Sequence, residues 1–496
     1  MALSSCLRLV CQNVGQPLKI RQVFSGVTSD KVVSLTTKKS GHDKSRKKQR
    51  RKISYQLDPD LSWEERLLDV VTPLWRLDYE EQLKKKFVEQ KNVLQKLSSQ
   101  LKELSKDQVE SSQTPEELCC PLHPVVPSPV INGYRNKSTF SVNRGPDGDP
   151  KTVGHYVGRY RKGMRLHIPP FSKNIVCVRS HHLLNMPEKH YQVAQCYEEM
   201  IHQSPLNSCL LFHDGGHWRE ITVRTNREGH TMAIIIFHPQ ELSQEELCAQ
   251  KESVKEFFTR GPGAECNLTS LYFQESSMTR CTHEQSPYQL LYGEPHIFEE
   301  ILGLKFRISP DAFFQVNTAG AEALYRTVQE LIQVEGNMVL FDICCGTGAI
   351  GLSMARHVSR VFGIELVEQA VDDAKWNASF NGISNCQFYS GKAEVVLPQL
   401  LSSLKEERSL TAVVNPSRAG LHYRVIWAIR KCKLIRTLVY VSCKPDGEAM
   451  RNFIELCCPP NDQKKIFGEP FVLMQAIPID MFPHTPHCEL VLLFRR

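Results

Sequence analysis

The last third of the chain contains seven short apolar runs that are regularly spaced. They predict strands near residues 338 to 341, 360 to 364, 386 to 390, 410 to 414, 436 to 442, 470 to 478 and 490 to 494, and helical patterns separate the first six. Strands that alternate with helices form a doubly wound, mostly parallel sheet of the α/β class. Only a short loop, 481 to 489, joins the last two runs, so we expect a hairpin there and an antiparallel final strand.

Polar and glycine residues follow the first two predicted strands. Ligands of such sheets bind outside the carboxyl ends of the parallel strands. Gly346 and Gly348 form a tight turn after the first strand, and Glu365 ends the second, where a carboxylate can accept hydrogen bonds from ribose hydroxyls. The chain has no phosphate-binding Gly-x-x-x-x-Gly-Lys-Ser/Thr motif and no third glycine in this turn. S-adenosylmethionine, an adenosine cofactor without phosphates, therefore fits the pattern better than NAD or ATP.

Two residues near the ends of later strands are candidates for covalent chemistry. Cys443 ends the fifth strand, and Pro445 prevents its continuation, which places the thiol at the ligand edge. Lys444 beside it is expected to favour the thiolate. Glu489 begins the antiparallel strand, so it is expected at the same edge. A core cysteine and an exposed edge glutamate are the alternative interpretations, and the pair His484 and His487 is more typical of structure than of a metal site.

Three further segments precede this sheet. Residues 57 to 115 predict helix, with Val93, Leu97, Leu101 and Leu104 on one face, and 111 to 129 is typical of a linker. Residues 116 to 300 predict an α+β central domain, including a hairpin around 226 to 229. Lys and Arg beside aromatic side chains suit contact with RNA phosphates and stacking on RNA bases, and a solvated sheet edge is the alternative interpretation. The candidate residues are Tyr134, Arg135, Asn136, Lys137, Tyr156, Tyr160 and the stretch 159 to 165.

The first 56 residues carry thirteen Lys and Arg against two Asp, a charge of +11, so the rest of the chain is −4 although the net charge of the whole is +7. Its first acid is Asp30, which is typical of a mitochondrial transit peptide, and we expect a disordered basic leader and a matrix protein. The run from 44 to 52 could instead be a nuclear signal or an RNA-binding arm. The chain's eighteen cysteines include no Cys-x-x-Cys pair, which favours reduced thiols, and no apolar run is long enough to span a membrane.

Ordered motifs in the chain resemble the RNA uracil-5 methyltransferase family. They are YRNKSTFSV at 134 to 142, SPDAFFQVN at 309 to 317, DICCGTG at 342 to 348, GIE at 363 to 365, NPSRAG at 415 to 420, YVSCKP at 440 to 445 and FPHTPHCE at 482 to 489. The resemblance implies a Rossmann-like seven-stranded methyltransferase domain at 301 to 496 and methylation of uridine C5 in tRNA, rRNA or both. It also implies Cys443 as nucleophile and Glu489 as base, with Gln315, Glu365 and Asn415 binding S-adenosylmethionine beside Gly346 and Gly348. We expect a monomer that binds RNA, without a metal or metal cluster.

Three positions depart from the family pattern. Asn415 stands where Asp is usual, Ala349 where Asn is common, and Cys344 where a bulky aromatic is common. Weaker cofactor binding is therefore expected. Two other functions stay open at this stage: an amino-group RNA methyltransferase, suggested by the Asn-Pro pair at 415, and an RNA-binding assembly factor with a degenerate methyltransferase domain.

Overall fold

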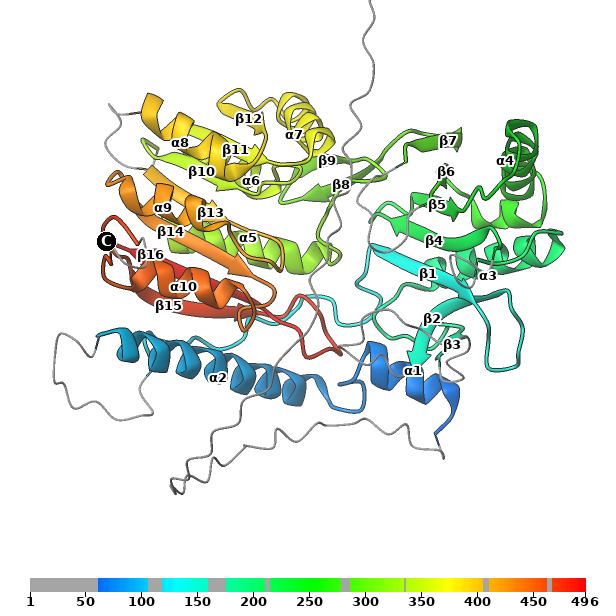
Figure 1. The fold of residues 1–496 in the computed structure, drawn as a ribbon, viewed down its shortest axis with the longest axis horizontal. Helices are drawn as coiled ribbons and strands as arrows, with labels where there is room; N and C mark the ends of the chain where they lie inside the picture. Colours follow the sequence, from blue (N-terminus) through cyan, green and yellow to red (C-terminus); the bar gives the residue numbers. More distant parts are fainter. Residues whose placement is uncertain are drawn as a thin grey trace, which may run out of the picture. The chain divides into compact units, whose positions relative to one another are not determined.

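A computed structural model describes residues 61–105, 118–158, 175–209, 215–277, 286–333, 336–404, 410–461 and 466–496. The part of the chain from Leu57 to Arg496 forms one compact unit (Figure 1). The predicted leader, Tyr160 and the basic stretch from 159 to 165 lie outside the described residues.

A seven-stranded sheet occupies the last third of the chain, with strand order β12-β11-β10-β13-β14-β16-β15. Strands β10 to β14 pair in parallel, whereas β16 lies antiparallel between β14 and β15. The strands are β10 (Val339–Ile343), β11 (Arg360–Glu365), β12 (Cys386–Ser390), β13 (Leu410–Val414), β14 (Ile435–Ser442), β15 (Val472–Ile479) and β16 (Glu489–Arg495). The predicted strands, the final hairpin and the antiparallel last strand are confirmed.

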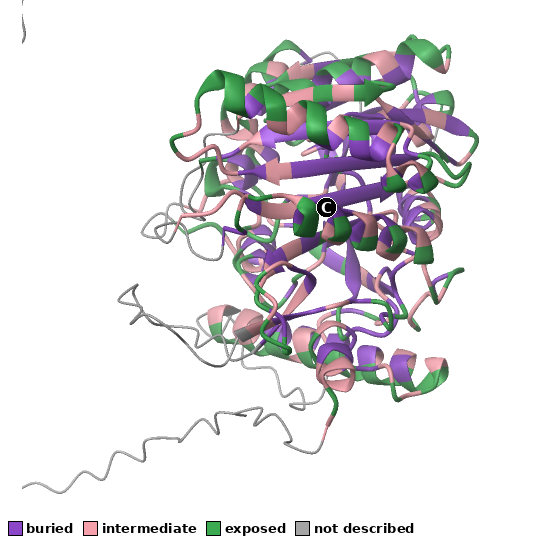
Figure 2. Ribbon diagram, turned by 90° about the vertical axis from the view of Figure 1, so that its right-hand side faces the viewer, coloured by how far each residue is buried: buried purple, intermediate pink, exposed green. Residues whose placement is uncertain are grey.

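Helices cover both faces of this sheet, so the central strands are buried along their length (Figure 2). Neighbouring residues of β10 show the alternation, since Leu340 packs into one apolar core and Phe341 into the other. Strands buried on two faces are nearly continuous apolar runs, as the sequence pattern indicated. The helices are α5 (Thr318–Ile332), α6 (Ala349–Met354), α7 (Glu368–Phe380), α8 (Ala393–Ser403), α9 (Tyr423–Lys431) and α10 (Ala449–Cys457).

The central part of the chain forms a second seven-stranded sheet, of order β3-β2-β1-β4-β5-β6-β7. The expected hairpin is present as antiparallel β4 and β5, and the α+β prediction is confirmed. A separate ribbon of β8 and β9 crosses the predicted domain boundary at 300. The elements are β1 (Lys137–Asn143), β2 (Thr152–Gly158), β3 (Ile175–Val178), α3 (Glu188–Gln203), β4 (Trp218–Thr225), β5 (Thr231–Phe237), α4 (Gln244–Thr259), η1 (Pro262–Cys266), β6 (Ser270–Glu275), β7 (Tyr288–Gly293), β8 (Ile297–Ile301) and β9 (Leu304–Ile308).

The predicted helical segment divides between the two sheets. Helix α1 (Trp63–Val71) starts at a capping box formed by Ser62 and Glu65 and packs on β2 and β3. Helix α2 (Tyr79–Ser105) packs on α10 beside the other sheet (Figure 1). On α2, Leu94 and Leu97 are fully buried, whereas Leu104 is only half-buried. Residues 61–105 therefore pack against both sheets and do not form a separate domain.

The prediction of a linker at 111 to 129 is wrong for its described part. Residues 121 to 126 extend along the edge strand β15, where His123 N donates to Ala476 O at 2.9 Å and Val126 N donates to Pro478 O at 2.8 Å. An edge strand has free backbone groups that can pair with a proline-rich extended segment, because the residues between the prolines, here His123 and Val126, keep an amide that can donate. Among the described residues, no helix has the length and apolar character that a membrane span requires.

Candidate functional site

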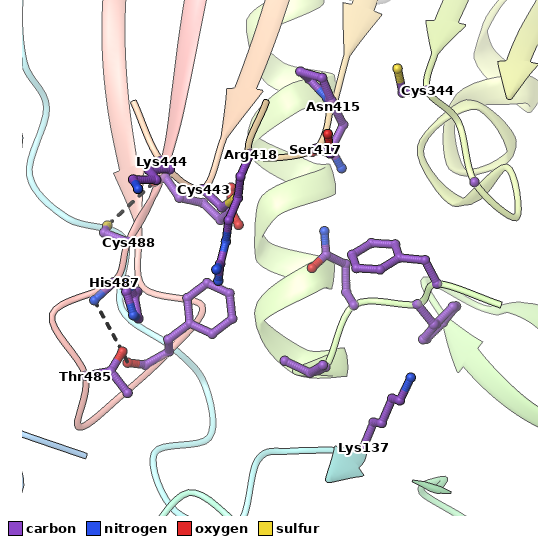
Figure 3. A pocket seen from close by; sticks show the side chains of 18 of the residues that line it. Lys137, Cys344, Asn415, Ser417, Arg418, Cys443, Lys444, Thr485, His487 and Cys488 are labelled. Carbon is purple, nitrogen blue, oxygen red and sulfur yellow. Dashed lines mark hydrogen bonds between the residues drawn. The ribbon is translucent and has the colours of Figure 1, made fainter. Parts of the chain in front are cut away.

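The carboxyl ends of the parallel strands meet at one edge of the last sheet. Ile343 pairs with both Ile364 and Val414, and Val414 pairs with Tyr440. Ser442 pairs with Leu490 of the antiparallel strand, so Cys443 and Glu489 emerge at the same edge. A pocket of about 1500 Å³ opens there (Figure 3). Its lining includes six of the seven predicted site residues: Gln315, Gly346, Glu365, Asn415, Cys443 and Glu489.

One part of the pocket is built from the turn after β10 and the end of β11. The Gly346 amide donates to Glu365 Oε2 at 3.0 Å, while Glu365 Oε1 accepts from the amides of Leu366 at 2.7 Å and Val367 at 3.0 Å. These three bonds fix the carboxylate in place. Gly346 has a φ of +56°, and a Cβ there would meet nothing within 4 Å, so a ligand can approach the backbone.

Apolar side chains that face solvent line the same pocket. Leu366 is 63% exposed, Val367 48% and Phe313 67%. Exposed apolar groups within a pocket mark a place where a flat, apolar ligand surface can be covered. Sequence reasoning did not select these residues, because an apolar side chain next to a strand end is indistinguishable there from a core residue.

The seventh predicted residue, Gly348, does not line the pocket. Its φ is +80°, and a Cβ there would lie 3.0 Å from the Phe388 ring, so glycine is needed for the turn and its packing. Asp342 has a related role, because its Oδ2 accepts from the Gly351 amide at 2.8 Å. Burial raises the pKa of Asp342 to about 7. Gly348 and Asp342 therefore stabilise the conformation of the turn after β10 and do not face the pocket as ligand contacts.

The remaining predicted residues approach from other elements. Gln315 is 7% exposed, and its backbone oxygen accepts from Asn136 Nδ2 at 2.8 Å. Asn415 follows β13, and its amide donates to Ile343 O at 3.2 Å. Cys344 and Ala349, two of the departures from the family pattern, also line the pocket. Burial raises the pKa of Cys344 to about 12, so this position is uncharged at neutral pH.

The Cys443 thiol is half-buried, and its surroundings differ from the prediction. Burial raises its pKa, the charge of Glu489 raises it further, and a hydrogen bond and the charge of Arg418 oppose both effects. The sequence pointed to Lys444 as the cation beside this thiol, whereas Arg418 supplies the larger opposing effect, through a hydrogen bond and its charge. Figure 3 shows the Arg418 side chain running alongside Cys443. Its place in the loop after β13 could have marked it, since that loop also carries Asn415.

Glu489 is nearly fully buried, at 4% exposed, and its Oε2 has no hydrogen-bond partner among the described residues. Burial raises its pKa to about 7, and the charge of Arg418 partly offsets this effect. A carboxyl group with such a pKa can exchange a proton near neutral pH. A buried, unpaired carboxyl oxygen at a pocket is also typical of a group that meets its partner on the ligand.

The central sheet contributes a basic wall to the pocket. Tyr134, Arg135 and Lys137 line it, and Figure 3 shows Lys137 reaching in from the side opposite Arg418. Burial, with Arg224 and Arg135 nearby, lowers the pKa of Lys137 to about 8. Asn136 holds the backbone of Gln315 at the pocket's rim, whereas Tyr156 lies outside the lining.

Replacing Arg418 with glutamine tests the electrostatic coupling. Without this cation the pKa values of Cys443 and Glu489 should both rise, because its charge lowers each of them. We expect Cys443 to react more slowly with iodoacetamide at pH 7.5, and activity to fall on the order of 10²-fold. Arg424, an exposed arginine outside the pocket lining, supplies the control Arg424→Gln, which should leave both quantities unchanged. Unaltered alkylation of the Arg418 variant would contradict the assignment.

Comparison with known proteins shows which family has a sequence like that of this pocket. The family model described as tRNA (Uracil-5-)-methyltransferase matches residues 300–496, which include the pocket's strand ends. Human tRNA (uracil-5-)-methyltransferase homolog B is 66% identical over 90% of this chain and 87% of its own length. The chain belongs to the tRNA (uracil-5-)-methyltransferase family.

Other members of the tRNA (uracil-5-)-methyltransferase family extend the likeness. The zebrafish (Danio rerio) homolog B is 60% identical over 88% of each chain, and human homolog A is 43% identical over 87% of this chain and 68% of its own. The crystal structure of Pyrococcus abyssi tRNA (uracil-54, C5)-methyltransferase, solved with S-adenosyl-L-homocysteine, has the same fold. It matches with a TM-score of 0.56 at 23% identity over 85% of this chain and 84% of its own.

Proposed function

We propose that this protein methylates C5 of uridine in RNA with S-adenosylmethionine, using Cys443 as nucleophile and Glu489 as proton acceptor. The observation that carries the proposal is the meeting of these two side chains, from the end of β14 and the start of β16, in one pocket with Arg418. Family membership supports the class of reaction.

The residues of the pocket fit the proposed cofactor. The fixed carboxylate of Glu365 suits a pair of ribose hydroxyls, and the exposed Leu366 and Val367 suit an adenine ring. The open backbone at Gly346 gives room for the rest of an adenosine. When bound, S-adenosylmethionine supplies the methyl group on a positively charged sulfur.

The chemistry of uracil requires both a nucleophile and a base. Its C5 is a weak nucleophile, but addition of the Cys443 sulfur to C6 moves the electrons of the C5–C6 double bond into an enolate that is reactive at C5. Burial keeps Cys443 protonated until substrate binds, and its proton passes to solvent water as the C6–S bond forms. Once C5 carries the methyl group, the Glu489 carboxylate removes the C5 proton. The double bond then reforms and Cys443 departs as thiolate.

The substrate base has to leave its stack to reach this pocket. Both C5 and C6 must face protein groups, so a uridine in an RNA loop costs least to present. Lys137 and Arg135 on the opposite wall suit contact with phosphates next to the extruded nucleotide. The T-loop of tRNA is the substrate we propose, with small-subunit rRNA as a second candidate. The cellular site we propose is the mitochondrial matrix.

The test is transfer of labelled methyl from S-adenosylmethionine to unmodified mitochondrial tRNA and to small-subunit rRNA, followed by nucleoside analysis. Label in 5-methyluridine supports the proposal and identifies the RNA. RNA binding without label in any nucleoside would favour an assembly factor instead, and label in a methylated amino group would favour the amino-group reaction. Fusion of residues 1 to 56 to a fluorescent reporter tests the location, and nuclear accumulation would overturn it.

The pH dependence of methylation follows from the titration of Glu489. Its pKa is raised to about 7, so below pH 7 it is protonated and cannot accept the C5 proton. Loss of protons from Cys443 has the same direction of effect. We expect single-turnover rates to rise with pH, with a limb below pH 7 that is steeper by about tenfold per pH unit than the rise above pH 7, where only Cys443 still has a proton to lose. A rate that stays constant down to pH 5.5 would contradict the role of Glu489.

A further inference from the structure

The loop between β15 and β16 is fastened to helix α2 at two points. This loop, residues 480 to 488, leads directly into Glu489 and is called the base loop below. His484, near its middle, has a left-handed φ of +66° and is 7% exposed. A non-glycine residue in that conformation needs surrounding contacts to hold it.

Gln82 of α2 makes the first attachment. Its Oε1 accepts from the backbone amide of His484 at 2.7 Å, and its Nε2 lies 3.2 Å from His484 Nδ1. The oxygen of His484 accepts from the Leu74 amide at 2.9 Å, and Nε2 of its ring lies 2.7 Å from Asn132 Oδ1. The backbone and the side chain of His484 are thus both held in place, and in the part of the chain that the structure describes Gln82 is the one residue whose side chain contacts both.

Lys86, one turn further along α2, makes the second attachment. Its ammonium group forms an ion pair with Asp480, and both side chains are 0% exposed. Lys86 Nζ also donates to Phe482 O at 3.0 Å, and the Phe482 amide donates to Asp480 Oδ1 at 3.0 Å. The hydroxyl of Tyr79 donates to Asp480 Oδ2 at 3.1 Å.

This part of α2 is built differently from a helix that merely packs. Tyr79, Gln82 and Lys86 occupy one face and bind the base loop through polar groups, whereas Leu94 and Leu97 further along bind the sheet domain through apolar contact. A buried ion pair adds little net stability compared with apolar residues of similar size, but it imposes a defined geometry. The polar half of α2 therefore fixes the conformation of the base loop, which ends at Glu489.

We propose that α2 is a positioning element for the reaction, in which Gln82 and Lys86 hold the base loop so that the Glu489 carboxylate stays buried and directed into the pocket beside Cys443. Helix α2 lies outside residues 300–496, which the family model matches. The inference rests on the proposed function of Glu489, and it makes Gln82, Lys86 and His484 positioning residues, since none of them is required to touch the RNA.

Gln82→Met tests the proposal, because methionine keeps the volume and removes both hydrogen bonds to His484. With full-length protein, unmodified tRNA and labelled S-adenosylmethionine, we expect kcat to fall about 10- to 100-fold while the KM for tRNA changes less than about threefold. Water admitted around Glu489 should lower its pKa, so the acid limb of the rate profile should move about one unit or more towards lower pH. A purely structural role would change neither kcat nor this limb at temperatures where the protein is folded.

Ser98→Ala is the matched control on the same helix. Ser98 is buried, and its Oγ accepts from the Cys119 amide at 2.7 Å, so it fastens α2 to residues 118 to 120 and not to the base loop. We expect a similar loss of thermal stability without a change in kcat or in the acid limb. Should Gln82→Met not fold, Gln82→Glu keeps an acceptor for the His484 amide, and we expect an intermediate fall in kcat.

The outcomes separate this proposal from the proposed function. If wild-type protein forms 5-methyluridine and the Gln82 variants keep its kcat and acid limb, or if Ser98→Ala loses activity equally, the positioning role is overturned and the function stands. If wild-type protein forms no 5-methyluridine, the proposed function fails and the positioning role fails with it.

Discussion

Replacing Cys443 with alanine should abolish formation of 5-methyluridine. Without sulfur addition at C6, uracil C5 cannot attack an electrophilic methyl group at a useful rate, so the loss should be on the order of 10⁴-fold or more. The Cys443 side chain is half-buried at the end of β14, and shortening it leaves the sheet's pairing intact. The measurement is labelled methyl in RNA nucleosides under single-turnover conditions.

Cys386 provides the matched control for this substitution. It is also a half-buried cysteine of the same sheet, in β12, but it does not line the pocket. Cys386→Ala should methylate RNA at the wild-type rate. Methylation that survives in Cys443→Ala would contradict the covalent mechanism and would support transfer to an amino group, which needs no thiol.

Replacing Glu489 with glutamine should slow turnover by about 10²- to 10⁴-fold and trap the RNA on the protein. Sulfur addition and C5 methylation remain possible in this variant, but the C5 proton has no acceptor. The C6–S bond then cannot break, so a protein–RNA adduct resistant to denaturant should accumulate. Glu300→Gln, at an exposed position outside the pocket lining, should do neither.

The same Glu489 substitution should change stability with a defined sign. The carboxyl pKa is raised from an ordinary 4.5 to about 7 by burial, so the folded state binds the proton more tightly than the unfolded state. Its favourable contribution is present in full below about pH 4.5 and is lost as pH rises to 7. Glutamine does not titrate, so at pH 8 the variant should be more stable than wild type, by up to about 3 kcal/mol. Urea unfolding at pH 5 and pH 8 measures this, and a variant less stable at pH 8 would contradict the burial of the charge.

The sequence was sufficient for the catalytic sheet because its signals are local. Strands such as β10 and β13 are buried along their whole length and are apolar apart from Asp342 and Thr411, since helices cover both their faces, and the helices between the strands dictate parallel pairing. The short loop before β16 allows only an antiparallel hairpin. The start of β16, with Glu489, therefore lies at the same sheet edge as Cys443. The position of a residue at the end of a strand was therefore enough to predict that it lies at the pocket.

Interactions between distant segments could not be predicted in this way. Arg418 acts on Cys443 because β13 and β14 lie side by side in parallel and the residues after both strands line one pocket, whereas proximity in sequence favoured Lys444. Residues 121 to 126 have the composition of a linker, yet their backbone pairs with the edge strand β15. Lys86 lies on a helix with many exposed lysines, and only its ion pair with Asp480, almost four hundred residues away, distinguishes it.

The most direct test of the central claim is to trap the covalent step. Fluorine at C5 cannot be removed as a proton, so tRNA that contains 5-fluorouridine should remain attached to wild-type protein when S-adenosylmethionine is present. Digestion and mass spectrometry should then find the modified nucleoside on the peptide that contains Cys443. An adduct on another cysteine, or no adduct from a protein that methylates ordinary tRNA at C5, would contradict Cys443 as the nucleophile.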